Sequence, residues 1–396
     1  MTGTGEVEQE QEPRHPGWQP LTAVLDTTTP FFEKLLYLRS FEDFCSNIYI
    51  IMGEYVTIVD PGNDYTAFMD LFKLQLKPAD IKKIVLTHGH PDHAVGAFEL
   101  LRSYSSLIQG GGLELILHEA APPQLKEVVK EFGSRVVEVR GGETLELSGT
   151  EWEVIYTPGH TIDGICLYHP PTKTVFTGDM VLPDAVGAPD PAGGGDLEHY
   201  LFGLRALLRR DIENILPGHG LPVAWTGRKV VEETYESVMM KVIGAEDPIP
   251  WMQGATALGQ KGLLEEALFC SDKELARNAE NVKALELKAS CLTDLGRSAE
   301  AIEVFDRILA QKRDHVFALT GKGCALMGVG RYDESLPYFE GALQQDPRMK
   351  DALVYKGMAL YLSGRQEAAM DIEAFRTEFV GRFKEELRKK TDPSGQ

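Results

Sequence analysis

Seven histidine and aspartate residues in the first part of the sequence have the types and spacing of metal ligands. Residues 87–93, Thr-His-Gly-His-Pro-Asp-His, carry four of them and the other three follow singly, so that the set is His88, His90, Asp92, His93, His160, Asp179 and His219. The segment 87–93 offers too little apolar surface to hold four polar side chains as core residues. Metal binding explains why imidazoles and carboxylates gather there.

The size of this set predicts more than one metal ion. A catalytic Zn²⁺ usually takes three protein ligands and a water, whereas five imidazoles and two carboxylates are present. A His-x-His pair with a later histidine makes a site of three nitrogens. Asp92, His93 and another late histidine make a mixed site, which leaves one carboxylate to bridge. Cysteine is absent from these positions, which argues against a closed structural zinc site. We therefore expect two Zn²⁺ ions, with Fe or Mn as alternatives.

Each ligand segment follows a stretch with the pattern of a buried strand. The short apolar runs at residues 83–87, 152–157, 174–177 and 214–216 each lead directly into a turn that carries a candidate ligand. Sites on α/β architecture commonly lie where strands end. We therefore expect four strand ends to deliver the ligands to one edge of a sheet.

The segments at 87–93, 158–160, 178–179 and 217–219, together with the strand and turn at 58–62, resemble the metallo-β-lactamase superfamily. The resemblance covers about residues 21–240 and implies an αββα sandwich, with two sheets face to face and helices outside. It implies that the first metal is held by His88, His90 and His160. It implies that the second is held by Asp92, His93 and His219, with Asp179 as the bridge.

The resemblance also implies a role behind the ligand loop for Asp60, which would accept an N–H from a ligand histidine and fix its tautomer. The alternative is an aspartate that only forms the turn before residues 61–62.

Within the superfamily, the ligand set is more similar to glyoxalase II, lactonases and RNase Z-like enzymes than to true β-lactamases, which lack an aspartate at the position of Asp179. This implies a metal-dependent hydrolase in which two cations about 3.5–4 Å apart share a bridging hydroxide. It would cleave an ester, thioester or lactone, and Asp92 or Asp179 would orient the nucleophile. The alternatives are a phosphodiesterase or ribonuclease, a mononuclear-Fe sulfur dioxygenase that leaves His93 and His219 idle, and a protein that acts chiefly through its repeats.

Those repeats occupy the C-terminal part, where glycine and leucine recur every 34 residues, at Gly262, Gly296, Gly330 and Gly364 and at the leucine four positions before each. This period is typical of tetratricopeptide (TPR) repeats, which are stacked helix pairs. Glycine suits the turn within each pair because it adopts the left-handed conformation readily. Five positions after each glycine, a small residue lets the helices approach: Ala267, Ala301, Ser335 and Ala369. The repeats predict docking of a protein partner or self-association.

The fold class we predict is therefore α/β, an αββα metallo-β-lactamase sandwich followed by an all-α TPR solenoid. The expected domains are a disordered tail at 1–20, a catalytic domain at 21–247 and a repeat domain at 248–390 with a solvating terminal helix. The first 20 residues lack the basic start and apolar core of a signal peptide. No apolar run is long enough to span a membrane, and the five cysteines form no C-x-x-C pair. We expect a cytoplasmic protein.

The charge distribution bears on the substrate. Of 60 acidic and 40 basic residues, 25 acidic and 22 basic lie from residue 241 onward, so the N-terminal part holds most of the acidic excess. Binding of nucleic acid draws on lysine and arginine, so this surface argues against a nuclease. We expect a small-molecule substrate.

Three weaker candidates are expected to be ordinary structural residues. His118 is expected at a strand end or on the surface. His199 and Tyr200 are expected at the start of a helix facing solvent, the alternative being that one of them touches substrate. The glycine-rich segment 187–195 is expected to line the pocket as a mobile loop.

Overall fold

The computed structural model describes residues 17–39, 45–63, 70–108, 112–185, 187–245 and 249–381. The chain forms two compact units that divide between Val242 and Ile243. The predicted boundary at residue 247 and the first sixteen residues of the predicted tail lie outside the described residues. Gln19 and Pro20, at the end of that tail, form a short strand that pairs with Leu36 and Tyr37.

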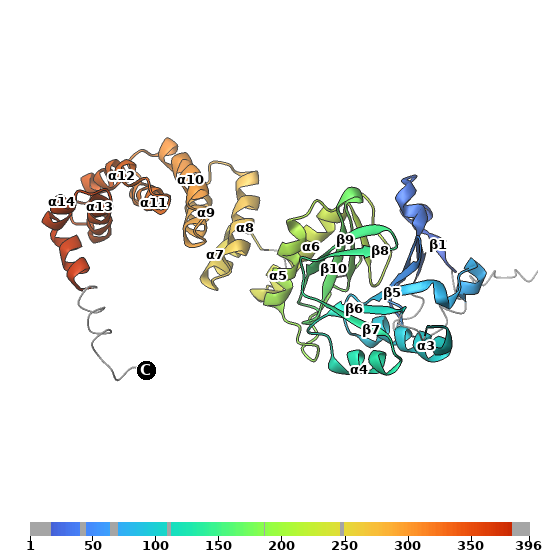
Figure 1. The fold of residues 1–396 in the computed structure, drawn as a ribbon. Coiled ribbons are helices and arrows are strands. Elements are labelled where there is room, and N and C mark those ends of the chain that lie inside the picture. The colour runs from blue at the N-terminus through green and yellow to red at the C-terminus, as the bar shows by residue number, and fades with distance from the viewer. Residues whose placement is uncertain are drawn as a thin grey trace, which may run out of the picture. The chain divides into compact units, whose positions relative to one another are not determined.

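The first unit contains two sheets (Figure 1). The seven-stranded sheet has the order β1-β2-β3-β4-β5-β6-β7, antiparallel from β1 to β4 and parallel from β4 to β7. The five-stranded sheet has the order β12-β11-β10-β9-β8, in which β11 and β12 are parallel. The strands are β1 (Gln19–Pro20), β2 (Leu35–Leu38), β3 (Ile48–Met52), β4 (Val56–Val59), β5 (Ile81–Val85), β6 (Glu114–His118), β7 (Arg135–Val139), β8 (Thr144–Leu147), β9 (Thr150–Tyr156), β10 (Ile165–His169), β11 (Thr174–Gly178) and β12 (Asn214–Pro217).

Both faces of the larger sheet are buried, because its strands are apolar at consecutive positions. In β3, Ile48 and Ile50 point to one side and Tyr49 and Ile51 to the other, as the two-residue period of a strand requires. The first side packs on helices. The second packs on the smaller sheet in a core that includes Trp152 and Phe176.

Helices cover the outer faces of the sandwich. Ala97 and Leu101 of α3 (Pro91–Ile108) and Val129 of α4 (Pro123–Glu131) belong to the core on the outer side of the larger sheet. Next to the smaller sheet lie α5 (Leu197–Leu208), which contacts β9, and α6 (Gly227–Val242), which packs on α5 (Figure 1). The predicted αββα arrangement is confirmed.

Shorter helical segments complete this unit: α1 (Leu21–Val24) and the 3-10 turns η1 (Pro30–Lys34), η2 (Asp70–Leu74), η3 (Pro78–Asp80) and η4 (Pro170–Thr172). The second unit is helical, with α7 (Trp251–Gln260), α8 (Leu264–Arg277), α9 (Val282–Asp294), α10 (Ser298–Gln311), α11 (Val316–Gly328), α12 (Tyr332–Gln345), α13 (Lys350–Leu362) and α14 (Gln366–Asp371).

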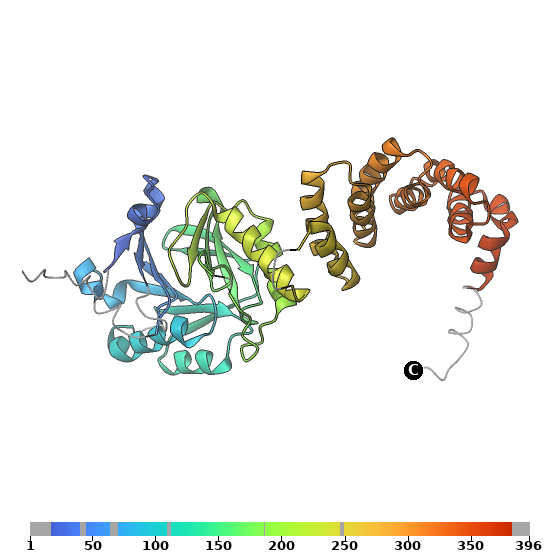
Figure 2. The same ribbon diagram turned by 180° about the vertical axis from the view of Figure 1, so that it is seen from behind.

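The second unit is the predicted array of helix pairs, which follow one another along the chain (Figure 2). A turn with a left-handed glycine joins the two helices of each pair, with φ values of 78°, 73°, 80° and 87° at Gly262, Gly296, Gly330 and Gly364. The predicted small residues are fully buried: Ala267, Ala301, Ser335 and Ala369. Both predictions are confirmed, because the turns need a residue without Cβ and the helices cross at a residue with a short side chain.

An ion pair links each helix pair to the next with the same 34-residue period. Lys288 of α9 reaches back to Asp272 of α8 at 2.5 Å, and Lys356 of α13 reaches back to Glu340 of α12 at 2.9 Å. Between them, Lys322 of α11 pairs with Asp306 of α10. We call these three pairs the lysine ladder.

The predicted terminal helix spans residues 376–390, and only its first residues lie in the described chain. Residues 373–381 are helical, and Phe375 is buried with Phe379 packed beside it against Phe339 and Leu360. This segment therefore covers the last core of the array, and residues 382–390 lie outside the described part. Among the described residues, we find no helix with the length and apolar character needed to cross a membrane.

Candidate metal centre

The loop after β5 places four of the predicted ligands. β5 ends at Val85, and α3 begins at Pro91, a residue suited to the first turn of a helix because it lacks an N–H. Asp92 and His93 therefore lie in the first turn of α3. Gly89 is required between the histidines, because a Cβ there would lie 2.7 Å from Pro122 Cδ.

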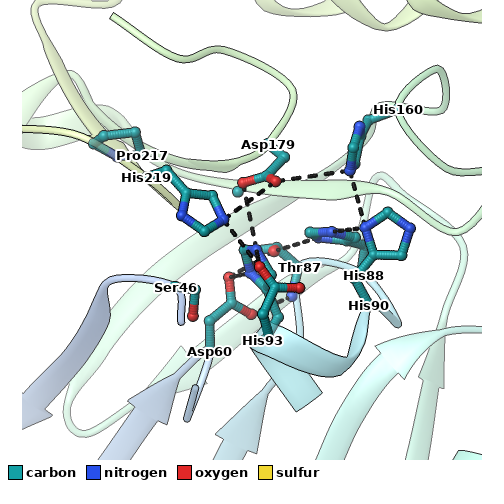
Figure 3. A network of polar contacts seen from close by, with 12 residues as sticks. Ser46, Asp60, Thr87, His88, His90, His93, His160, Asp179, Pro217 and His219 are labelled. Atoms are coloured by element: carbon teal, nitrogen blue, oxygen red, sulfur yellow. Dashed lines mark hydrogen bonds and ion pairs between the residues drawn. The ribbon is translucent and has the colours of Figure 1, made fainter. Parts of the chain in front are cut away.

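The other three predicted ligands come from the smaller sheet. His160, Asp179 and His219 follow β9, β11 and β12, whereas the loop at 87–93 follows β5 of the larger sheet. The expectation that all ligands meet at one edge of one sheet is therefore wrong. The two sheets lie face to face, so the ends of strands from both layers meet above them (Figure 3).

Two turns of the smaller sheet fit only glycine. Gly159 has a φ of 146°, and a Cβ on it would lie 2.3 Å from the Cα of Tyr200. A Cβ on Gly218 would lie 2.3 Å from Asp179 Oδ1. Gly159, before His160, thus lets its turn approach α5 closely, and Gly218, before His219, lets its turn approach Asp179.

Ring nitrogens of His88, His90 and His160 face one another. His90 Nδ1 lies 3.0 Å from both His88 Nε2 and His160 Nε2. On the outer side, His90 Nε2 is 2.9 Å from Asp190 Oδ2, and His160 Nδ1 is 2.7 Å from the carbonyl oxygen of Ala188. A carboxylate and a carbonyl only accept, so the outer nitrogens donate and the inner nitrogens of His90 and His160 present lone pairs. Lone pairs 3.0 Å apart repel, and a cation between them removes the repulsion.

A second cluster adjoins the first. His219 Nε2 lies 3.0 Å from Asp92 Oδ2 and 3.5 Å from Asp179 Oδ2, and His93 Nε2 lies 3.4 Å from Asp179 Oδ1. Asp179 Oδ2 is also 3.7 Å from His160 Nε2, so this carboxylate faces both clusters. Among the described residues, His93 Nε2 and Asp179 Oδ1 are buried and have no hydrogen-bond partner. Such atoms are stable when a metal ion satisfies them.

Asp60 and Thr87 support the loop from behind (Figure 3). Asp60 is 2 % exposed and accepts from Thr87 N at 2.8 Å, from Thr87 Oγ1 at 2.6 Å and from His93 Nδ1 at 2.9 Å. His93 therefore carries its hydrogen on Nδ1 and points the lone pair of Nε2 toward Asp179. Thr87 Oγ1 is left to accept from His88 Nδ1 at 3.2 Å, which turns the lone pair of His88 Nε2 toward His90. The predicted contact from Asp60 to a histidine of the set is confirmed.

Electrostatics divide the histidines into two groups. Burial lowers the pKa of His88 well below its usual value, with His93 adding repulsion, and burial lowers the pKa of His160 as well. Burial also opposes a charge on His93, but Asp179 and Asp60 outweigh it and raise its pKa well above the usual range. Burial would raise the pKa of Asp179, yet His93 and the other imidazoles hold it well below the usual range. The place between His93 and Asp179 therefore favours positive charge, which a proton or a metal ion supplies.

Two residues make contacts at the site that the sequence pattern did not predict. Asp190, in the glycine-rich segment, accepts from His90 and from the backbone N–H groups of Ala192 and Gly193. Tyr200 is fully buried and donates toward the carbonyls of Asp179 and Met180 at 3.1 and 2.9 Å, so the expectation that it faces solvent is wrong. Its position four residues after the helix cap Asp196 gives it the inner face of α5.

The remaining weak candidates have structural roles. His118 is 5 % exposed and stacks on Tyr156 with ring centroids 4.3 Å apart, at the end of β6 as expected. His199 is half exposed and pairs with Asp196 at the start of α5. Neither lies among the clustered histidines.

Comparison with known proteins gives the family of each unit. A family model described as "Metallo-beta-lactamase superfamily" matches residues 42–219, and one described as "Tetratricopeptide repeat" matches residues 253–315 and 320–375. The N-terminal unit is a metallo-β-lactamase superfamily domain, and the C-terminal unit is a TPR array. Both resemblances seen in the sequence are confirmed, and this superfamily fold implies binding of divalent metal.

Relatives of the first unit include named hydrolases. The atrochrysone carboxyl ACP thioesterase AacuM of Aspergillus aculeatus is 26% identical over 191 residues, which are 48% of this chain and 54% of that protein. The hydroxyacylglutathione hydrolase GloC of Haemophilus influenzae is 27% identical over 198 residues, which are 47% of this chain and 90% of GloC. The chain thus spans about half the length of the fungal thioesterase. Among solved structures, the metallo-β-lactamase family protein TTHA1429 of Thermus thermophilus is 22% identical with a TM-score of 0.42, covering 57% of this chain and 86% of that chain.

Proposed function

We propose that this chain is a dinuclear metal hydrolase that cleaves an ester, thioester or lactone, with a thioester as the first choice. The observation that carries the proposal is the meeting of seven ligand-type side chains in two adjacent clusters that share the Asp179 carboxylate. One relative is named as a thioesterase and another as a hydrolase of hydroxyacylglutathione, which favours the thioester class.

The donor set decides which residues would hold each ion. His88, His90 and His160 offer three imidazole nitrogens, and Asp92, His93 and His219 offer a carboxylate and two imidazoles, with Asp179 between the groups. Nitrogen and carboxylate ligands without thiolate suit Zn²⁺, Fe or Mn, and we propose Zn²⁺. Bound ions of this kind supply Lewis-acid polarisation and a water that ionises near neutral pH.

The protein's own residues would orient and confine this chemistry. Asp60 holds the His93 tautomer, and Asp190 and the Ala188 carbonyl hold those of His90 and His160. Asp92 accepts from His219 Nε2 at 3.0 Å, and Asp179 lies beside both His93 and His160, so either carboxylate could orient the proton of an attacking water. Tyr200 donates a hydrogen bond to the backbone carbonyl of Asp179 and so fixes the position of that residue.

Two alternative activities are less well supported. A ribonuclease would need lysine or arginine along the substrate path, whereas the acidic excess lies in the N-terminal part of the chain. An Fe-dependent dioxygenase with one ion would leave His93 and His219 without a role, although both lie in the second cluster. We further propose that the TPR array binds a protein partner or a second copy of the chain, because it adds recognition surface and none of the clustered ligands.

The deciding experiment is metal analysis of the purified full-length chain together with turnover of thioester, lactone, phosphodiester and RNA substrates at physiological salt. We expect two metal ions per chain and turnover of a thioester or lactone that is lost in His90→Ala. A single firmly bound Fe with O₂-dependent activity would refute the hydrolase. Efficient RNA cleavage that is lost in His90→Ala would refute the choice of substrate class.

A further inference from the structure

A cavity of about 350 Å³ opens beside His90. This volume falls within the range of small-molecule pockets. Its wall is largely apolar or backbone, from Ala120, Pro122, Ile162 and Ala192 together with glycines of the ligand loop and of the segment 187–195. Because His90 lines both this cavity and the first histidine cluster, a molecule seated in the cavity extends toward the clustered ligands.

One acidic residue of the cavity wall, Asp163, has no lysine or arginine beside it among the described residues of that wall. Asp163 is 4 % exposed, and its Oδ2 is buried without a hydrogen-bond partner among the described residues. The cavity lining, as far as the structure describes it, contains neither lysine nor arginine. A buried carboxylate that is neither paired nor fully hydrogen-bonded is costly, so such residues commonly await a partner.

A second polar residue of the wall, Thr161, does not share this role. Its methyl carbon lies beside Gly193 of the cavity wall, because a Cβ on Gly193 would be 3.0 Å from Thr161 Cγ2. Thr161 also lines a separate cavity of about 10 Å³, whose wall includes Thr87, Thr157 and Thr177 and the clustered side chains of His88, His160 and Asp179. That space is about the size needed for one water, which suits the unpartnered Thr161 hydroxyl. Asp163 is therefore the polar group that the larger cavity offers to a ligand, apart from His90 at its edge.

We propose that this cavity, with Asp163 in its wall, receives a neutral or cationic part of the substrate that carries an N–H donor, and that it disfavours substrates with a carboxylate there. The reason is electrostatic: an N–H group supplies the hydrogen bond that Asp163 Oδ2 lacks, whereas a second carboxylate beside Asp163 adds repulsion. This inference rests on the proposed hydrolase function, because it assigns a substrate class to the same site. An amide-bearing thiol arm fits this description, and a thiol arm that ends in a free acid does not.

The test uses the metal-loaded full-length chain and two butanoyl thioesters, one of N-acetylcysteamine and one of 3-mercaptopropionate. We expect the wild type to prefer the N-acetylcysteamine ester by about tenfold in kcat/KM, mainly through KM. Asp163→Asn removes the charge at nearly constant shape and should reduce the preference to about threefold or less. Asp163→Ser is a second variant in case the first folds poorly, and Glu127→Gln, an exposed carboxylate on α4, is the charge-matched control and should keep the wild-type preference.

The outcomes separate this inference from the proposed function. Equal kcat/KM for the two esters in the wild type, or an unchanged preference in both Asp163 variants, would overturn the role of the cavity. If neither ester is hydrolysed, the proposed thioesterase activity fails, and the cavity is then tested by NMR saturation transfer to the two non-hydrolysable S-butyl thioethers. Preferential binding of the amide thioether, lost in Asp163→Asn, supports the cavity alone, and equal binding overturns it.

Discussion

Replacing Asp60 by asparagine tests how the protein presents His93. The native carboxylate serves two donors at Oδ2, from Thr87 Oγ1 and His93 Nδ1, and one donor at Oδ1, from Thr87 N. An asparagine has one acceptor oxygen, and its NH₂ group must face either the Thr87 amide or His93 Nδ1. The backbone does not forbid the change, since asparagine tolerates the φ of 51° at this position.

The two orientations have different costs. If the NH₂ group faces the Thr87 amide, two donors meet in a buried site, which costs about 1–3 kcal/mol of stability. If it faces His93, the imidazole must accept at Nδ1, so its hydrogen moves to Nε2 and the lone pair toward Asp179 is lost. Loss of such a supporting partner typically lowers metal affinity by about 10- to 100-fold. That range corresponds to about 1.4–2.7 kcal/mol.

We expect Asp60→Asn to bind the metal ion at His93 more weakly than the wild type does. In a competitive titration with a chelator, followed by elemental analysis, the variant should lose one of two metal ions first. ¹⁵N chemical shifts of the imidazoles should report the change of tautomer at His93. Asp211→Asn is the matched control, because this surface carboxylate pairs with Lys173 rather than with the clustered histidines. The reasoning is refuted if Asp60→Asn keeps both ions at wild-type affinity with His93 still protonated on Nδ1.

Asp179→Ala removes the carboxylate shared by both clusters, so metal content should fall and turnover should drop by at least about 100-fold in elemental analysis and hydrolysis assays. Tyr200→Phe leaves the buried carbonyls of Asp179 and Met180 without a donor, and urea unfolding should show a loss of about 1–3 kcal/mol. Burial raises the pKa of the Cys166 thiol from 9.0 to about 12. The stability that the buried, protonated thiol contributes is therefore fully present below pH 9 and is lost as the pH rises toward 12. Mass spectrometry should find Cys166 alkylated by iodoacetamide at about pH 8.5 only after denaturation. A chain that ends at Val242, where the first compact unit ends, should fold, bind metal and hydrolyse a small ester; a metal-loaded but inactive product would mean that the repeats form part of the site.

The sequence predicted best those features that depend on residues close together in the chain. The 34-residue glycine period predicted the turns of the repeats, because a left-handed turn needs glycine regardless of distant contacts. The spacing within 87–93 predicted which loop brings histidines and an aspartate together, and the family resemblance predicted that Asp60 contacts one of the histidines, which is His93 in the structure. Whether the clustered residues bind metal stays a prediction.

Contacts between distant segments could not be read in the same way. The assignment of β5 to one sheet and of β9, β11 and β12 to the other depends on strand order, which the apolar runs do not encode. Asp190 meets His90 across 100 residues, and Tyr200 reaches Asp179 only because Gly159 lets α5 approach. Asp163 Oδ2 has no hydrogen-bond partner in the described part of the chain, and this too depends on residues that are distant in sequence.

The lysine ladder has a consequence for how the array can change in length. Each rung joins the second helix of one pair to the first helix of the next, and the donor and acceptor positions are the same in every pair. Removing or duplicating one complete 34-residue unit would therefore join a lysine to a carboxylate at the new junction, with the glycine turns still in phase. Recombination that adds or removes whole repeats in register would keep a lysine–carboxylate pair at each junction. The length of the recognition surface could therefore change in evolution without altering the residues of the first unit.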